Sequence, residues 1–239
     1  MPSANLFRLA CFVVIFLFTV TSSNTLQAQG ERVITTTVDD GGAANGHTGI
    51  YAIPQQPQDI SPLLYGEKLP IATLADAAGK PFDLNKAIAE KPSILVMYRG
   101  GWCPYCSIQL SGLQQALPAL EEMGYQLIAV STDEPSGLAQ SAAKEKLGYT
   151  LLSDADLALS KQLGIAFKAP KAYWNMLPKT TGGKNPDLLL PVPSVFIFDK
   201  KGIIQFEYIN PDFKQRLDPD LLLAVAGSIK KRMAVSTGR

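Results

Sequence analysis

Two short apolar runs dominate the hydrophobic pattern of the chain. Ser93 to Tyr98 and Tyr125 to Ser131 contain few polar residues, a pattern typical of strands that are buried on both faces of a parallel sheet. Between the two runs, leucines recur at spacings of three and four, at positions 110, 113, 117 and 120. This spacing predicts a helix with one apolar face, in which Pro118 should introduce a kink.

The remaining elements follow from shorter patterns and from turn and capping residues. We expect two hairpins, one of Leu69–Leu74 and Phe82–Leu84 and one of Ser194–Asp199 and Ile203–Ile209, and a further strand at Tyr149–Leu152. We also expect a helical turn at Asn85–Glu90, a helix at Pro135–Leu147, a helix from the Ser153-Asp154 cap to Leu163, and a last helix that Asp218 caps. Strands and helices alternate before the final hairpin. The order predicts an α/β fold with a mixed central sheet, helices on both faces and an N-terminal β-hairpin.

The segment from Phe167 to Pro191 does not fit this alternation. It contains several prolines and the turn Thr181–Lys184, and it is too long for an ordinary connection. We interpret it as an inserted loop or a lid. Its aromatic residues Tyr173 and Trp174 either line a substrate groove or pack within the loop itself.

The N-terminal region has the composition of an export signal. Arg8 precedes an unbroken apolar run from Leu9 to Val20, and Leu26–Ala28 offers a cleavage site with a small residue. The apolar run is shorter than the roughly 20 residues of a spanning helix, so we predict a signal peptide at 1–28 and keep an uncleaved anchor as the alternative. Residues 29–61 are then a flexible extension, and 62–239 form the folded domain.

Composition and charge narrow the class of protein. A hydrophobic content of 46% and a charged content of 18% indicate a globular domain, and a net charge of +1 gives no support for binding nucleic acid. Cleavage after residue 28 would remove Cys11 and leave two cysteines, Cys103 and Cys106. We therefore expect an exported protein, periplasmic or extracellular, with no membrane span in the mature chain, in a compartment where thiols tend to pair.

These two cysteines lie where the first apolar strand gives way to a helix. Cys103 is placed at the helix N-cap with Pro104 at the first helical position, where free N–H groups and the helix dipole stabilise a thiolate. Cys106 lies one turn further on. We predict that Cys103 attacks and Cys106 resolves the mixed disulfide. An inert disulfide or half of a zinc site are the alternatives, although zinc needs about four ligands and His47 is the single histidine.

The motif Trp102-Cys103-Pro104-Tyr105-Cys106 after a buried strand resembles the active site of the thioredoxin fold. The whole stretch from Ser61 to Ala226 is similar to the peroxiredoxin-like branch of the alkyl hydroperoxide reductase/thiol-specific antioxidant (AhpC/TSA) family. The resemblance implies a cis Val192–Pro193 bond, with Pro193 facing the disulfide and Val192 and Pro193 helping to bind an extended substrate. Trp102 would offer an apolar contact to a partner, and Tyr105 would tune the potential and adjoin the substrate.

The sequence departs from this family at two positions. Cys103 stands where the family has a peroxide-orienting hydroxyl, and Pro193 stands where it has an arginine, a role that Arg99 or Arg216 could take over. Both departures favour thiol–disulfide exchange. We therefore predict an exported thiol–disulfide oxidoreductase with a redox-active Cys103–Cys106 pair and no bound cofactor or metal, whose partners are protein or small-molecule thiols and disulfides. There are two alternatives. The first is a thiol-dependent peroxidase using Cys106 or Cys103, for which peroxides would be additional partners. The second is a non-catalytic binding protein.

Overall fold

A parallel, three-stranded block forms the centre of the sheet. The computed structural model describes residues 52–237, and in it β3 (Ser93–Tyr98) pairs in parallel with β4 (Gln126–Ser131), which pairs in parallel with β5 (Thr150–Ser153). Every side chain of β3 is buried. The two apolar runs are thus confirmed as central strands, covered on both faces as such runs require.

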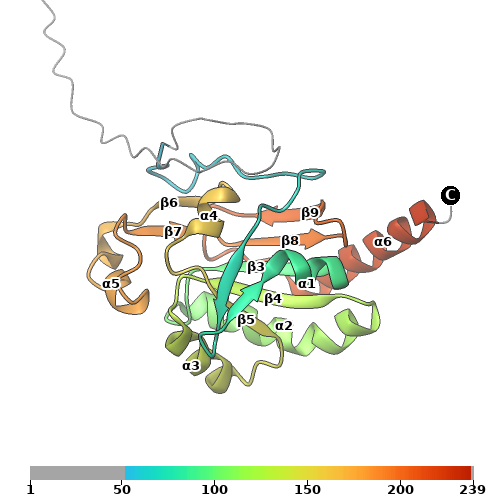
Figure 1. The fold of residues 1–239 in the computed structure, drawn as a ribbon, viewed down its shortest axis with the longest axis horizontal. Coiled ribbons are helices and arrows are strands. Elements are labelled where there is room, and N and C mark those ends of the chain that lie inside the picture. Colours follow the sequence, from blue (N-terminus) through green and yellow to red (C-terminus); the bar gives the residue numbers. More distant parts are fainter. Residues whose placement is uncertain (1–51, 238–239) are drawn as a thin grey trace, which may run out of the picture. The chain divides into compact units, whose positions relative to one another are not determined.

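Antiparallel strands extend this block at both edges. The order of the seven-stranded sheet is β2-β1-β5-β4-β3-β8-β9, of which Figure 1 labels β5, β4, β3, β8 and β9. The added strands are β1 (Thr73–Asp76), β2 (Pro81–Asp83), β8 (Ser194–Phe198) and β9 (Ile204–Ile209). Both predicted hairpins are present, and the central sheet is mixed as expected.

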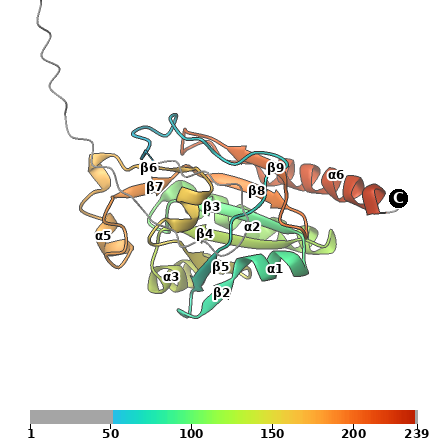
Figure 2. The same cartoon turned by 45° about the horizontal axis from the view of Figure 1, so that its top comes forward.

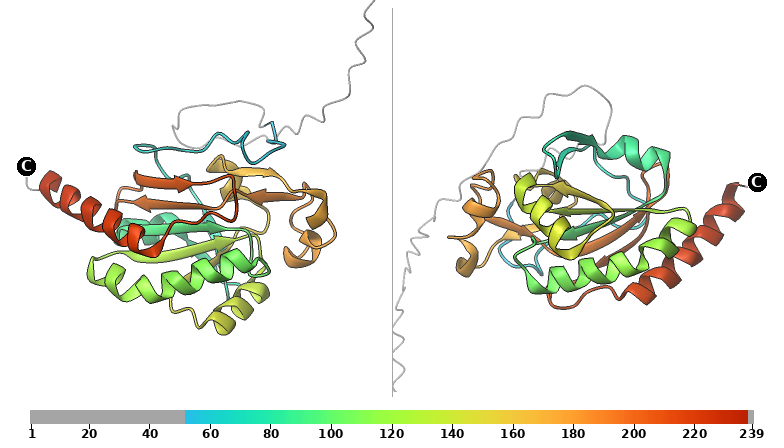
Figure 3. Two further views of the ribbon diagram at one scale, coloured as in Figure 1. Left: turned by 180° about the vertical axis from the view of Figure 1, so that it is seen from behind. Right: turned by 90° about the horizontal axis from the view of Figure 1, so that it is seen from below.

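Helices cover both faces of the sheet, and β3 contributes side chains to the two sides in turn. Ile94, Val96 and Tyr98 face a cluster formed with α2 (Pro104–Glu122), α3 (Pro135–Glu145) and α6 (Pro219–Thr237). Leu95 and Met97 face the opposite cluster, formed with α1 (Leu84–Glu90) and α4 (Ala158–Gln162). Figure 3 shows α2 and α6 side by side on one face and α1 on the other.

The predicted loop at 167–191 is an ordered subdomain. It contains a two-stranded antiparallel sheet of β6 (Ala166–Lys168) and β7 (Leu189–Pro191), with the short helices η1 (Lys171–Tyr173) and α5 (Leu177–Thr180) between the strands. In Figure 2 it lies at the end of the sheet away from the C-terminal end of α6. Because each strand has three residues, the sequence gives no alternation long enough to predict them.

Several element boundaries differ from the prediction. Leu69 to Ala72 precede β1, and the helix expected from the Ser153-Asp154 cap to Leu163 begins later, as α4. The physical reason is the conformation of Leu157, whose positive φ of 57° ends the loop before the helix. The Asp154 carboxylate still caps α4, since it accepts the backbone N–H groups of Leu159 and Ser160.

The compact part begins before the predicted start at residue 62. Ile53 packs against Leu157 and Leu189, and Ile60 packs against the core beneath α1 and α4. The backbone carbonyl of Pro54 also accepts the N–H of Lys168. Residues 52–61 are therefore part of the folded domain. The predicted leader at 1–28 and the extension at 29–51 lie outside the described residues.

The Val192–Pro193 peptide bond is trans, so the expectation of a cis bond is wrong. No cis peptide bond occurs among residues 52–237. The chain passes almost directly from β7 into β8 at this point. Its extended path is fixed because the Val192 N–H is donated to Ile165 and the Val192 carbonyl accepts the Ser194 hydroxyl. The turn geometry of a cis bond would interrupt this path.

Two types of feature are absent from the part of the chain that the structure describes. None of its helices combines the length and the apolar composition that crossing a membrane requires. Within the same residues, no three His, Cys, Asp or Glu side chains are grouped closely enough to hold a metal ion.

Candidate functional site

Five residues connect β3 to α2, and two of them are glycines that other side chains approach closely. Gly100 has a φ of +151°, and a Cβ atom there would lie 2.7 Å from the Asp133 carboxylate and would overlap the Trp102 indole. A Cβ atom on Gly101 would overlap the Ser141 hydroxyl of α3. The Gly101 N–H is donated to the Asp133 carboxylate at 2.6 Å. This tight turn delivers the chain from the buried strand directly to the first turn of α2.

Cys103 is the N-cap of α2 and Pro104 is its first residue, as predicted. The Cys103 carbonyl accepts the N–H groups of Cys106 at 2.9 Å and Ser107 at 3.1 Å, which starts the helix. Both cysteines are free thiols, and both are buried, with 2% of Cys103 and 0% of Cys106 exposed. The structure therefore presents the dithiol form of the pair.

The surroundings of Cys103 favour its thiolate. The pKa of Cys103 is lowered from 9.0 to about 5, first because the Cys106 thiol donates a hydrogen bond to it. The Cys106 backbone N–H and the positive charges of Arg99 and Arg216 lower it further, while burial opposes these effects. These surroundings therefore favour the ionised form of Cys103, which is the state in which a thiol is nucleophilic.

The surroundings of Cys106 have the opposite effect on its pKa. Burial raises the pKa of the Cys106 thiol, and its hydrogen bond to Cys103 raises it further. Arg216 partly offsets this, because its guanidinium Nη2 donates to the Cys106 sulfur at 3.4 Å. Arg216 is itself held by the Gln109 amide oxygen at 3.0 Å and the Phe213 carbonyl at 2.7 Å. The two pKa values are thus shifted in opposite directions, which favours a thiolate on Cys103 and a protonated thiol on Cys106.

Arg99 occupies an aromatic enclosure beside Cys103. Its guanidinium carbon lies 4.9 Å from the ring centre of Trp102, 4.5 Å from that of Tyr173 and 4.3 Å from that of Phe213. Its Nη1 lies 3.9 Å from the Cys103 sulfur, and 4% of the residue is exposed. Each sulfur of the pair therefore has its own arginine, Arg99 for Cys103 and Arg216 for Cys106.

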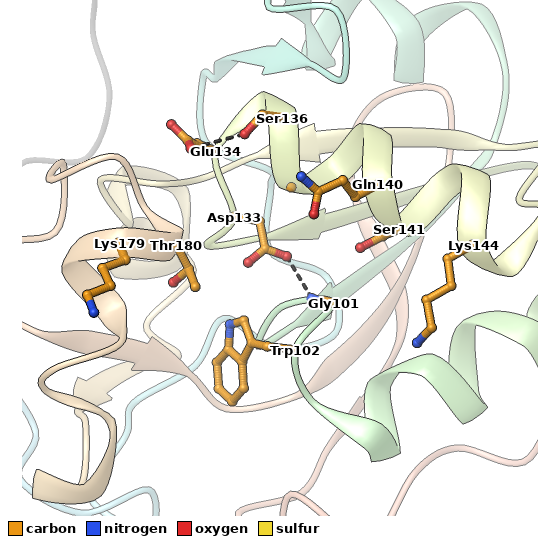
Figure 4. Close-up of a pocket in the computed structure, with 11 residues that line it drawn as sticks. Gly101, Trp102, Asp133, Glu134, Ser136, Gln140, Ser141, Lys144, Lys179 and Thr180 are labelled. Carbon is orange, nitrogen blue, oxygen red and sulfur yellow. Dashed lines mark hydrogen bonds between the residues drawn. The ribbon is translucent and has the colours of Figure 1, made fainter.

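A cavity of about 370 Å³ adjoins the turn on the side of α3 and α5. Figure 4 shows Asp133, with its bond to Gly101, and Trp102 among the residues that line it. Neither cysteine lines this cavity. Burial raises the pKa of Asp133 from 3.8 to about 6, although the bond from Gly101 opposes that rise. Asp133 therefore supports the turn through its hydrogen bond from the Gly101 N–H.

The structure brings two further predicted residues to the site. Trp102 packs against the Arg99 guanidinium and Tyr173, with the two rings centred 5.4 Å apart. Tyr105 is 38% exposed and contacts Phe213 edge-on. Ile108, one turn along α2 from Tyr105, is also exposed. An apolar surface thus adjoins the cysteines, as expected for Trp102 and Tyr105, whose roles toward a substrate stay predictions.

Val192 and Pro193 are both buried. Val192 lies in the apolar cluster against which Trp102 and Tyr173 pack, so it supports these two rings. The backbone groups of Val192 and the carbonyl of Pro193 are bonded within the chain, the latter to the N–H of Asn210 at 3.4 Å. These internal bonds leave the pair's part in binding an extended substrate a prediction.

Sequence reasoning missed two residues of the site and left a third undecided. Asp133 could have been found, because it follows the carboxyl end of β4, next to the end of β3, where sites of open α/β sheets lie. Phe213 carries no such signal, since it lies in the loop between β9 and α6. Tyr173 was assigned either to a groove or to loop packing, and its contact with Arg99 now places it at the site.

Known proteins with similar sequences are peroxiredoxins. The chain is 29% identical over 164 residues to peroxiredoxin Bcp of Escherichia coli (strain K12), which covers 69% of this chain and 96% of the relative. It is 28% identical over 145 residues to the chloroplastic peroxiredoxin Q of Populus jackii, covering 61% of this chain and 60% of the relative.

Solved structures show the same fold. The peroxidoxin BcpB of Mycobacterium tuberculosis superposes with a TM-score of 0.58 at 19% identity, covering 70% of this chain and 98% of the other. A structure of Xanthomonas campestris peroxiredoxin Q superposes with a TM-score of 0.54 at 20% identity, covering 66% and 91%. The model of the AhpC/TSA family matches residues 65–207, which include the cysteine pair and most of the sheet. The chain therefore belongs to the AhpC/TSA family and is a peroxiredoxin-like oxidoreductase with a thioredoxin-like fold.

Proposed function

We propose that the protein is a thiol-dependent peroxidase in which Cys103 attacks the peroxide and Cys106 resolves the product. The observation that carries this proposal is the placement of two thiols in the first turn of α2, with Cys103 at the N-cap, Arg99 beside its sulfur and Arg216 beside the sulfur of Cys106. The relatives named peroxiredoxins support peroxide as the substrate. The sequence alone favours thiol–disulfide exchange over peroxide reduction, and the relatives now favour peroxide reduction.

The chemistry of one turnover follows from the two protonation states. The Cys103 thiolate attacks one oxygen of the hydroperoxide, the O–O bond breaks, and the departing alkoxide takes a proton from solvent, leaving a sulfenic acid on Cys103. The Cys106 sulfur then attacks the Cys103 sulfur. Hydroxide leaves with the Cys106 proton as water, and a disulfide forms. Two equivalents of an external thiol restore the dithiol.

Burial of the sulfur also favours a small substrate. With 2% of Cys103 exposed, a hydroperoxide group can reach the sulfur with much less rearrangement than a disulfide within a folded protein. Arg99 and the N-terminus of α2 supply positive charge beside the oxygen that leaves. Pro193 stands where the family resemblance expects an arginine. Arg99, which lies beside the attacking sulfur, would take over the role of that arginine.

A second candidate function, thiol–disulfide exchange with other proteins, has one observation in its favour. Tyr105 and Ile108 expose apolar surface beside the cysteine pair, and such surface suits contact with a protein partner. Exported protein thiols would then be the partners. The export itself remains a proposal that rests on the sequence of residues 1–28.

The decisive experiment measures peroxide consumption with a dithiol reductant. We expect wild-type protein to consume hydrogen peroxide or cumene hydroperoxide well above the rate of the reductant alone, and Cys103→Ser to abolish this. Without the reductant, Cys106→Ser should consume one equivalent of peroxide and accumulate a sulfenic acid that dimedone traps. Cys11→Ser is the matched control, because Cys11 lies in the predicted leader. Full activity in Cys103→Ser would refute the assignment, and reduction of insulin without peroxide consumption would favour exchange.

A further inference from the structure

The Arg99 guanidinium is buried without a carboxylate partner. Of the ion pairs found within residues 52–237, neither involves Arg99. Burying a cation away from water costs free energy unless an anion or other favourable contact compensates it. The aromatic faces of Trp102, Tyr173 and Phe213 compensate in part through cation–π contacts with the guanidinium.

An aromatic enclosure leaves the charge and the N–H donors of the guanidinium available, whereas a carboxylate partner does not. A carboxylate would neutralise the charge and occupy the N–H donors, whereas ring faces do neither. The full positive charge therefore remains directed at the Cys103 sulfur, 3.9 Å from Nη1. The enclosure thus fixes the arginine in place and keeps its charge available to the thiolate.

Two of the three rings come from segments distant in sequence from the cysteines. Tyr173 belongs to η1 in the β6–β7 insertion, where its N–H is donated to the Pro170 carbonyl at 2.9 Å. Phe213 lies in the loop before α6, and its carbonyl accepts the Arg216 side chain. Both segments are therefore anchored independently of Arg99, so they can hold the guanidinium in position.

We propose that Tyr173 and Phe213 are positioning residues, which act on the reaction by holding the Arg99 guanidinium over the Cys103 sulfur. The β6–β7 insertion is then part of the reactive site. This inference rests on the proposed function, in which Cys103 is the attacking thiol, and neither ring touches the reacting atoms itself.

The test measures the rate of iodoacetamide alkylation of Cys103 against pH in the full chain, with mass spectrometry to identify the modified cysteine. Tyr173→Leu and Phe213→Leu should each raise the pKa of Cys103, so that alkylation at acidic pH slows about threefold, and the double variant should slow about tenfold. Tyr173→Phe keeps the ring and should retain the wild-type pH profile. Trp174→Leu is the matched control, because the Trp174 ring contacts Lys168 and Lys171 instead of Arg99.

A double-mutant cycle separates action through Arg99 from a general effect on folding. Arg99→Met keeps an apolar side chain between the rings but removes the charge. In that background Tyr173→Leu should cause no further change in the pH profile, and Phe213→Leu gives the same test if Tyr173→Leu does not fold. An unchanged profile in the folded single variants, or an undiminished shift in the Arg99→Met background, would overturn the proposal. Peroxide consumption by Cys103→Ser is a separate readout, which tests the proposed function alone.

Discussion

Replacing Asp133 with asparagine should stabilise the protein at neutral and alkaline pH. Asp133 is 4% exposed, and burial raises its pKa from 3.8 to about 6. The folded chain therefore binds this proton more tightly than the unfolded chain does, so the free energy of unfolding falls as pH rises from about 4 to about 6. A pKa difference of about two corresponds to a loss of roughly 3 kcal/mol above pH 7. Asparagine removes this loss, because it has no charge to desolvate.

The geometry around Asp133 permits the exchange. The two donors on this carboxylate, the Gly101 N–H and the Ser131 hydroxyl, bond to the same oxygen, so the single amide oxygen of asparagine can accept both. Urea denaturation of wild type and Asp133→Asn should show equal stability near pH 4 and a difference that grows to a plateau above pH 7. A variant that is less stable than wild type at pH 8, or a difference independent of pH, would refute the reasoning.

Asp154→Asn provides the matched contrast. The pKa of Asp154 is also raised by burial, to about 7. However, Leu159 donates to one oxygen of this carboxylate, while the N–H and hydroxyl of Ser160 donate to the other. Asparagine would place an amide nitrogen against the Ser160 N–H. We therefore expect Asp154→Asn to be about 1–3 kcal/mol less stable than wild type near pH 4, where Asp133→Asn equals wild type, and to regain this loss at higher pH as the wild-type Asp154 carboxyl ionises.

Three further substitutions test the site and the core. Arg216→Met removes the donor to the Cys106 sulfur and should slow disulfide closure about tenfold in stopped-flow tryptophan fluorescence, and an unchanged rate would exclude that role. Gly101→Ala brings a methyl group against the Ser141 hydroxyl and should cost about 1–3 kcal/mol by thermal unfolding. Adding Ser141→Gly should recover part of this loss, and no recovery would locate the strain elsewhere. Leu110→Ala in the buried core should cost about 2–5 kcal/mol by urea denaturation, and a smaller loss would indicate collapse around the cavity.

The sequence predicted those parts of the fold and site that depend on local patterns. The apolar run of β3, the N-cap position of Cys103 and the cap of α6 at Asp218 all follow from neighbours within a few residues. The same locality makes the dithiol predictable from the sequence. Its two thiols lie one helical turn apart, so no tertiary contact is needed to bring them together.

Parts that depend on distant contacts could not be predicted in this way. The strands β6 and β7 are too short to show a pattern, and they form because they pair with each other across the insertion. Phe213 reaches Arg99 across more than one hundred positions, and no local rule relates the two. The family resemblance implies a cis Val192–Pro193 bond. The bond is trans, which reflects the hydrogen bonds that hold Val192 extended.

The placement of one arginine beside each sulfur has a consequence for the energy stored in the oxidised protein. When Cys103 and Cys106 join as a disulfide, the thiolate beside Arg99 disappears, and a buried cation is left facing neutral sulfur. Reduction restores the anion and relieves that cost, so electrostatics favour the dithiol and make the disulfide a stronger oxidant. In the proposed reaction, oxidation by peroxide would therefore leave the chain in its less favourable charge state. The arginines provide a driving force that returns the chain to the reduced form once a thiol arrives.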